Sequence, residues 1–197
     1  MFNKIFYWIS IFVLHVARWL HFPLKVYGRE NVPAKGPFII AGNHLSNLDP
    51  VLIPISCPRR LNFVAKEELF NNKIFGWVLL TLGAFPVRRG QTDLGAIRVF
   101  LDRLKTEPVL IFPEGTRMSE GKELKIQEGV GLLVKKTHLP VVPVCVEGTD
   151  IVMPRGAKTM KRHPVTLTFG KPISFDPGLS REEIAYAVLQ KIYELKK

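Results

Sequence analysis

Residues 36–50 read GPFIIAGNHLSNLDP. The apolar run 38–41 follows a Gly-Pro pair, which predicts a buried strand. The Asp-Pro pair at 49–50 predicts the start of a helix, because proline is favoured in the first helical turn. His44 therefore lies at the end of the strand, in a turn that can fold a carboxylate back onto its ring.

His44 and Asp49 form a candidate catalytic pair. An imidazole oriented by a carboxylate is the usual general base for activating a hydroxyl or a thiol. Each residue also has a structural explanation. Asp49 before a proline is typical of a helix N-cap, and His44 can be a hydrogen-bonded histidine at a strand end. The pair alone leaves both explanations open.

A second polar turn follows the apolar run 109–112. There the sequence PEGTR, residues 113–117, brings together a carboxylate, a hydroxyl and a guanidinium. Ligands of α/β proteins commonly bind at such sheet ends. Arg117 can hold a phosphate through two parallel hydrogen bonds, and Gly115 lets the backbone approach a ligand. The alternative is a strand-end turn with a solvated Glu–Arg pair.

Short apolar runs alternate with helical patterns along the rest of the chain. The predicted strands are 24–27, 38–41, 61–65, 109–112, 141–146 and 165–169. The predicted helices are 93–104, 127–136 and a last helix that follows the capping box of Ser180 and Glu183. This alternation predicts a single α/β domain over residues 24–197, with a largely buried mixed β-sheet flanked by helices. The apolar stretch 69–85 is either a buried helix or a membrane-facing surface.

The composition limits the kinds of partner and site. The 197 residues carry a net charge of +11, which indicates anionic partners such as nucleic acid, phosphorylated metabolites or a membrane surface. No nucleic-acid-binding motif is visible, so no nucleic-acid partner is expected. Cys57 and Cys145 show no pairing pattern and no metal-ligand spacing. The sequence therefore predicts a reducing compartment, no disulfide scaffold and no metal site.

The N-terminus differs in character from the rest of the chain. Residues 5–14 read IFYWISIFVL and lie between Lys4 and Arg18. This run is shorter than the ~20 residues that a membrane-spanning helix needs. Its aromatic and basic flanks favour a hydrophobic helix over residues 1–23 that anchors the protein in or on a membrane. The alternative is a core helix of a soluble domain.

Four blocks follow one another along the chain, namely NHLSNLD at 43–49, GAFPVRR at 83–89, FPEGTR at 112–117 and VPVCVEG at 142–148. In their order they resemble the blocks of the glycerolipid acyltransferase family, and in particular of bacterial 1-acylglycerol-3-phosphate acyltransferases. Departures from the usual family pattern occur at Pro86, Arg88 and Met118. They leave the preference for the acceptor open.

The resemblance implies that His44 is the general base and that Asp49 orients it. It also implies a site for the acceptor's glycerol phosphate and its headgroup, which is lined by Lys66, Arg88, Arg89, Glu114, Gly115, Thr116 and Arg117. Two of these assignments have alternatives. Lys66 can be a solvated residue after a strand, and the arginine pair can be a stop signal after an apolar helix.

The implied reaction moves a fatty acyl group from an acyl-carrier protein or coenzyme A thioester to the sn-2 hydroxyl of 1-acyl-glycerol-3-phosphate. The product is phosphatidic acid, and no cofactor is implied besides the thioester co-substrate. The transfer is expected to be direct, because the chain has no Gly-x-Ser-x-Gly elbow. Ser46 and Cys57 are the alternative nucleophiles for a covalent acyl-enzyme.

The expected partners are lysophosphatidic acid, the thioester donor and membrane phospholipids. The expected location is the cell membrane, as a peripheral or monotopic protein with its active site on the cytoplasmic side. Two alternatives remain open at this point. One is a sister acyltransferase that acts on glycerol-3-phosphate or a lyso-aminolipid, and the other is a non-enzymatic basic membrane-binding domain.

Overall fold

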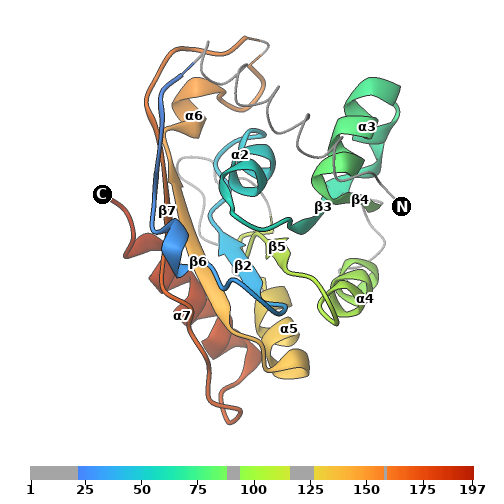
Figure 1. Cartoon of the computed structure of the whole chain (residues 1–197), viewed down its shortest axis with the longest axis vertical. Coiled ribbons are helices and arrows are strands. Elements are labelled where there is room, and N and C mark those ends of the chain that lie inside the picture. The colour runs from blue at the N-terminus through green and yellow to red at the C-terminus, as the bar shows by residue number, and fades with distance from the viewer. Residues whose placement is uncertain (1–21, 88–93, 116–126, 158) are drawn as a thin grey trace.

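The computed structural model describes residues 22–87, 94–115, 127–157 and 159–197. The apolar run 5–14, and with it nearly all of the predicted anchoring helix, lies outside these residues. The described part contains a seven-stranded sheet that carries helices on both faces (Figure 1). The strands are β1 (Leu24–Tyr27), β2 (Ile39–Gly42), β3 (Asn62–Lys66), β4 (Ala84–Val87), β5 (Val109–Ile111), β6 (Val141–Glu147) and β7 (Val165–Phe169).

The helices follow the strands in alternation, as the sequence predicts. They are α2 (Asp49–Ser56), α3 (Lys73–Leu82), α4 (Leu94–Arg103), α5 (Gly129–Thr137), α6 (Thr149–Val152) and α7 (Arg181–Tyr193), with short 3₁₀ turns η1 (Arg29–Asn31) and η2 (Glu67–Phe70). The predicted capping box is confirmed, because the Ser180 side chain accepts from the Glu183 backbone and the Glu183 side chain accepts from that of Ser180. The predicted strands and helices differ from the observed ones only at their ends.

The strands lie in the order β1-β7-β6-β2-β5-β3-β4. From β6 to β4 every neighbouring pair is parallel. β7 pairs antiparallel with β6 and parallel with β1, so the predicted mixed sheet is confirmed. The carboxyl ends of the five parallel strands therefore all lie at one edge of the sheet.

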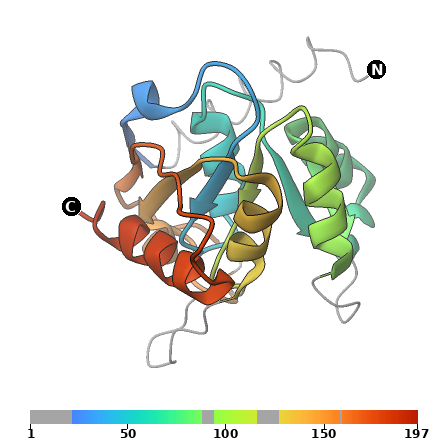
Figure 2. The same ribbon diagram turned by 90° about the horizontal axis from the view of Figure 1, so that it is seen from below.

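Alternate residues of the strands face two separate cores. On one face, Phe38 and Ile40 pack with α2 and α3. On the other face, Ile39 and Ala41 pack with α4, α5 and α7, which lie side by side in Figure 2. Because β2 is buried on both faces, its sequence is continuously apolar instead of alternating.

The apolar stretch 69–85 contains a helix and a strand. β4 was not predicted as a strand, because Pro86 interrupts the pattern. β4 is the edge strand of the sheet and pairs with a neighbour on one side only. An edge strand tolerates proline, because fewer of its N–H groups are needed for pairing.

α3 has both a buried and an exposed side. Leu79 and Leu82 are buried, whereas Ile74 is 79% exposed and Trp77 and Leu80 are each 40% exposed. These last three residues are called the apolar α3 surface below. Within the described ranges, none of the helices combines the length and the apolar character needed to cross a bilayer.

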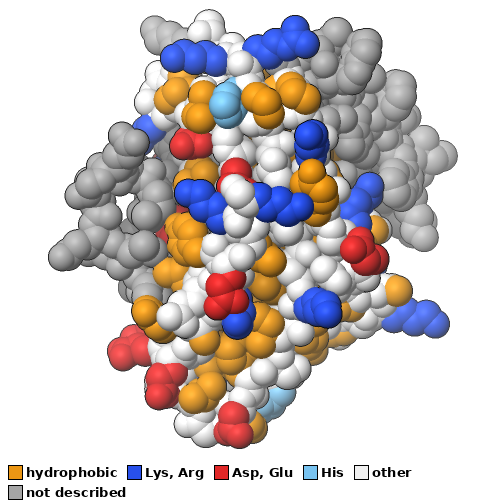
Figure 3. All heavy atoms as spheres, turned by 90° about the vertical axis from the view of Figure 1, so that its left-hand side faces the viewer, with side chains coloured by type: hydrophobic (Ala, Val, Ile, Leu, Met, Phe, Trp, Pro, Cys, Tyr) orange, Lys and Arg blue, Asp and Glu red, His pale blue; other side chains and the backbone are white. Residues whose placement is uncertain are grey.

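Basic residues are dispersed over one side of the molecule. Figure 3 shows the side that carries β1 and β7, where Lys and Arg side chains lie among acidic and apolar ones. The positive charge on this side does not form a single continuous patch.

Candidate active site

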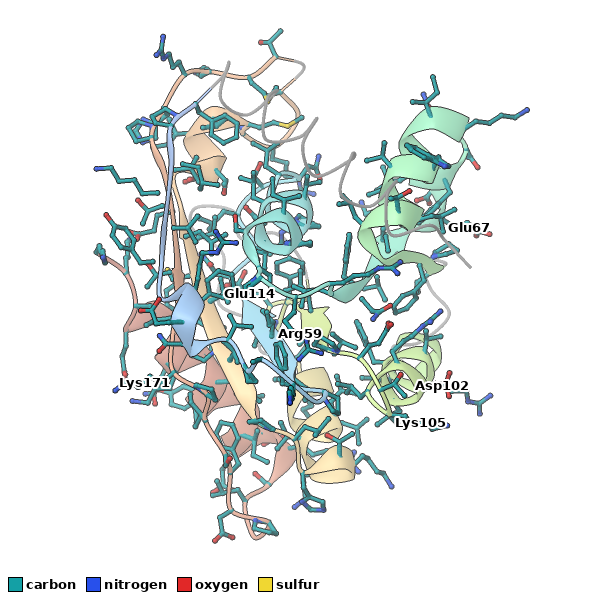
Figure 4. The ribbon with its side chains drawn as sticks, viewed as in Figure 1. Arg59, Glu67, Asp102, Lys105, Glu114 and Lys171 are labelled. Atoms are coloured by element: carbon teal, nitrogen blue, oxygen red, sulfur yellow. The ribbon has the colours of Figure 1, made fainter. Side chains whose placement is uncertain are left out.

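Polar residues follow three adjacent strands at one edge of the sheet. β2 leads into His44, β5 into Glu114 and β6 into Thr149. The three strands are parallel neighbours in the order β6-β2-β5, so their carboxyl ends bring these residues together. Open α/β sheets bind their ligands at this edge. Figure 4 shows Glu114 in the interior of the molecule, whereas Asp102 and Lys105 project from its periphery.

His44 and Asp49 form a hydrogen-bonded pair. The His44 Nδ1 atom lies 3.0 Å from Asp49 Oδ2. The Asp49 side chain is fully buried, and that of His44 is 17% exposed. Because a carboxylate only accepts hydrogen bonds, Nδ1 carries the proton and the lone pair is on Nε2. No protein group in the described part of the chain bonds to Nε2, which leaves this nitrogen for a substrate.

The Asp49 carboxylate is fixed by three further donors. The backbone N–H groups of Leu45 and Ser46 donate to Oδ2 at 2.6 and 2.7 Å. The Thr149 hydroxyl donates to Oδ1 at 2.7 Å. A fully buried carboxylate needs such partners, because an unsatisfied charge in the interior is costly.

Asp49 does not cap α2. It is the first residue of the helix, the N-cap is Leu48, and no side chain bonds to the first turn. The N-cap explanation of Asp49 is therefore wrong. The carboxylate instead turns back toward the preceding loop, where it binds the His44 ring.

Two side chains fasten this loop to neighbouring segments. Asn43 exchanges two hydrogen bonds with Val146 of β6. Its Nδ2 donates to the carbonyl at 2.8 Å, and the Val146 N–H donates to Oδ1 at 2.7 Å. The Ser46 hydroxyl donates to the carbonyl of Met153 at 2.8 Å. The backbone that carries His44 is thus held on both sides of the histidine.

The alternative nucleophiles are not arranged for attack. The Ser46 hydroxyl is fully buried and is used in the bond to Met153. Cys57 follows the last residue of α2, roughly 12 Å along the helix from Asp49. Burial raises the pKa of its thiol to about 11, so the thiolate is scarce at neutral pH. The geometry favours direct transfer.

Glu114 lies beside His44 and is 3% exposed. Its Oε2 accepts from the backbone N–H of His44 at 3.1 Å, and its Oε1 accepts from the hydroxyl of Tyr193 at 2.8 Å. Burial raises the pKa of Glu114, and these two hydrogen bonds oppose that shift. Both carboxylate oxygens thus bind protein donors.

The turn around Glu114 also contains Phe112 and Gly115. The Phe112 ring stacks on the His44 ring, with centroids 4.4 Å apart and planes at 26°. Gly115 has a φ of +64°, and a Cβ there would lie 2.6 Å from Cγ of Gln127. The left-handed backbone conformation favours glycine at this position, and any larger residue would also have to displace the Gln127 side chain.

The structure thus brings together His44, Asp49, Glu114 and Gly115 among the predicted site residues. Lys66 ends β3 and lies at the same edge of the sheet. The remaining predicted residues, Arg88, Arg89, Thr116 and Arg117, lie outside the described residues.

Sequence reasoning missed three residues of the site, namely Phe112, Thr149 and Tyr193. Thr149 directly follows the block 142–148, so its position at the end of a strand was a usable signal. Tyr193 lies on the buried side of a regular helix, where an aromatic residue is ordinary. Nothing in the local sequence marks it.

In the parts of the chain that the structure describes, no group of three or more His, Cys, Asp or Glu side chains is arranged to hold a metal ion. The carboxylate oxygens of Asp49 and Glu114, which both bond to His44, accept hydrogen bonds from protein groups.

Comparison with known proteins gives a consistent result. The model of the family described as Acyltransferase matches residues 23–147. The 1-acyl-sn-glycerol-3-phosphate acyltransferase of Bacillus subtilis is 34% identical over 181 residues, which cover 88% of each chain. The Streptococcus pneumoniae protein of the same name is 32% identical over 140 residues, or 69% of this chain. The chain spans about half the length of this protein and of the chloroplast relatives that it also matches.

A solved structure has the same fold. The crystal structure of the 1-acyl-sn-glycerophosphate acyltransferase PlsC from Thermotoga maritima superposes with a TM-score of 0.76 at 30% sequence identity. The match covers 95% of this chain and 78% of the other. The residues that the family model matches include the His44–Asp49 pair and the Glu114 turn. The resemblance to the family is confirmed. The chain belongs to the acyltransferase family.

Proposed function

We propose that the protein transfers an acyl group from an acyl thioester to the sn-2 hydroxyl of 1-acyl-sn-glycerol-3-phosphate and so forms phosphatidic acid. The observation that carries this proposal is the His44 imidazole, which is bound by Asp49 at Nδ1 and has no hydrogen-bond partner at Nε2 among the described residues. The names of the Bacillus and Streptococcus relatives support lysophosphatidic acid as the acceptor.

The chemical step follows from the position of the two ring nitrogens. The acceptor hydroxyl approaches Nε2, which takes its proton while the oxygen attacks the thioester carbonyl. The tetrahedral intermediate expels the thiolate, which then takes the proton from the imidazolium. Asp49 stabilises that imidazolium and keeps the ring oriented. A base in this position contributes roughly 10²–10⁴-fold to the rate.

The acceptor's phosphate needs cationic partners at the same edge of the sheet. We assign this role to Lys66, Arg88, Arg89 and Arg117. The carboxyl ends of β3, β4 and β5 lie at the same edge of the sheet as His44, which supports the assignment. Holding the phosphate positions the hydroxyl against Nε2, which lowers the barrier by several kcal/mol in favourable cases.

The proposed location is the cell membrane, as a peripheral or monotopic protein with its active site on the cytoplasmic side. Both lipid substrates are amphipathic, so an enzyme that meets them in a bilayer benefits from an apolar contact surface. The apolar α3 surface and the run 5–14 support this proposal.

The test is lipid product analysis by mass spectrometry with purified full-length protein. Lysophosphatidic acid is offered with acyl-carrier-protein and coenzyme A thioesters, and glycerol-3-phosphate and a lyso-aminolipid serve as competing acceptors. We expect phosphatidic acid as the main product. Higher kcat/KM on either competing acceptor would show that the substrate assignment is wrong.

His44→Ala is expected to abolish the transfer, because it removes the imidazole that takes the proton of the acceptor hydroxyl. His138→Asn is the control. His138 is exposed at the end of α5 in a left-handed conformation that asparagine tolerates, and its variant should keep full activity. Turnover by folded His44→Ala would remove His44 as the base.

A further inference from the structure

The last helix, α7, is linked to the candidate active site by a hydrogen bond to the buried carboxylate of Glu114. Tyr193 stands at the end of α7, and its hydroxyl donates to Glu114 Oε1 at 2.8 Å. The other oxygen of the same carboxylate accepts from the His44 backbone N–H at 3.1 Å. Because Glu114 is almost fully buried, water does not replace either donor.

The Tyr193 hydroxyl stays protonated near neutral pH and can donate a hydrogen bond. Burial raises the pKa of its hydroxyl, and the adjacent Glu114 carboxylate raises this pKa further. The proton is therefore retained and points at Glu114. In return, the hydrogen bond from Tyr193 lowers the pKa of Glu114 and favours its charged form.

We infer that Tyr193 is a positioning residue of the active site, which fixes the backbone of His44 through Glu114. The inference rests on the proposed role of His44 as the general base. Asp49 restrains the His44 ring and Glu114 restrains its N–H, so the direction of Nε2 is set from both ends of the residue. Tyr193 lies beyond the residues that the family model matches, 23–147.

The hydroxyl of Tyr193 can be removed without changing how α7 packs on the sheet. Ile184, Val188 and Ile192 are buried and attach α7 to the sheet independently of it. The Tyr193 ring packs against the same core. Phenylalanine at this position keeps that packing and removes only the donor to Glu114.

Near-attack geometry is sensitive to small shifts, so loss of this donor should affect the chemical step more than binding. For Tyr193→Phe we expect kcat to fall about tenfold, with the KM for lysophosphatidic acid within about twofold of the wild type. The melting temperature should fall by a few degrees, because the buried Glu114 carboxylate loses a donor, and kcat is therefore measured well below it. Tyr186→Phe is the matched control, because Tyr186 lies on the same helix and is 55% exposed.

A double-mutant cycle tests whether Tyr193 acts through Glu114. Glu114→Gln alone should also slow the reaction. The double variant Tyr193→Phe/Glu114→Gln should be no slower than Glu114→Gln, because residues that share one contact have non-additive effects. Losses in kcat that multiply would show that Tyr193 acts independently of Glu114.

Hydrogen–deuterium exchange supplies a readout that does not depend on turnover. Tyr193→Phe should speed amide exchange in the loop 43–48, and Tyr186→Phe should leave it unchanged. Unchanged exchange together with a wild-type kcat in Tyr193→Phe would overturn the inference. If the wild-type protein acylates a different acceptor, the proposed substrate fails, while the exchange measurement still decides the role of Tyr193.

Discussion

The Asp49 carboxylate receives four hydrogen bonds, from the His44 ring, two backbone N–H groups and Thr149. Oδ2 accepts three of these bonds and Oδ1 accepts one, so both oxygens of the buried carboxylate have a donor. Two of the donors are backbone groups of the loop itself, which couples the carboxylate's position to the loop's shape. At the scale of single residues, the geometry of the His44–Asp49 pair thus depends on Thr149 and on two backbone N–H groups.

Thr149→Val is the sharpest test of this arrangement. The variant keeps the shape of the fully buried side chain and removes the hydroxyl that donates to Asp49 Oδ1. We expect the free energy of unfolding to fall by about 1–3 kcal/mol, since a buried carboxylate oxygen loses its donor. The kcat should fall about tenfold because the carboxylate can then rotate away from His44.

Urea denaturation and steady-state kinetics measure the two effects on Thr149→Val. Thr149→Ser retains the hydroxyl and should recover most of the activity. A wild-type kcat in Thr149→Val would mean that the backbone donors alone hold Asp49.

At the scale of the helices, the contact between α5 and α7 depends on a glycine. A Cβ on Gly131 of α5 would overlap the backbone carbonyl of Arg181, the first residue of α7. The close approach lets α7 lie flat on the sheet beside α5 (Figure 2). It also brings Tyr193, at the other end of α7, to Glu114.

Gly131→Ala is expected to lower the free energy of unfolding by about 1–3 kcal/mol, because the added methyl group pushes α7 away from α5. Gly95→Ala on α4 is the matched control. A Cβ there meets no atom within 4 Å, so alanine should raise stability by about 0.5–1 kcal/mol. Equal stability of the two variants in urea denaturation would contradict the close contact of α5 and α7.

At the scale of the whole molecule, the exposed apolar residues are distributed unevenly. Ile74, Trp77 and Leu80 all belong to α3, on the opposite face of the sheet from α7. If this surface lies in a bilayer, Ile74→Glu should weaken binding to phospholipid vesicles about tenfold, since burying an isoleucine contributes about 1.5–3 kcal/mol. Vesicle sedimentation of the full-length protein measures the change.

Tyr186→Glu is the control for the vesicle measurement. Tyr186 is similarly exposed but lies on α7, so its variant should bind vesicles like the wild type. Equal binding by the wild type and by Ile74→Glu would exclude the apolar α3 surface as a membrane contact.

The sequence predicted the elements of this fold better than their arrangement. Strand β2 was recognised because both of its sides are apolar, and α7 because its capping box is local. The strand order was not predictable, because the reversal of β7 depends on pairing with β6 and β1. β4 was missed because a proline is acceptable only on an edge, and edges are known only once the sheet is assembled.

The same division applies to the active site. His44, Asp49 and Glu114 follow apolar strands in the sequence, which made them candidates, and the resemblance to the acyltransferase family implied their roles. The N-cap alternative for Asp49 was plausible because an Asp-Pro pair has the same local pattern whether or not the carboxylate turns back. Tyr193 could not be found, because its contact with Glu114 links residues 79 positions apart and depends on how α7 packs.

The long spacing of these contacts has a consequence for the folding pathway. His44 meets Glu114 across 70 positions, Asp49 meets Thr149 across 100, and Glu114 meets Tyr193 across 79. Contacts of this range form slowly, because closing long loops costs chain entropy before any bond repays it. A partly folded chain therefore has no oriented base, and recovery of activity during refolding should coincide with the last and slowest phase.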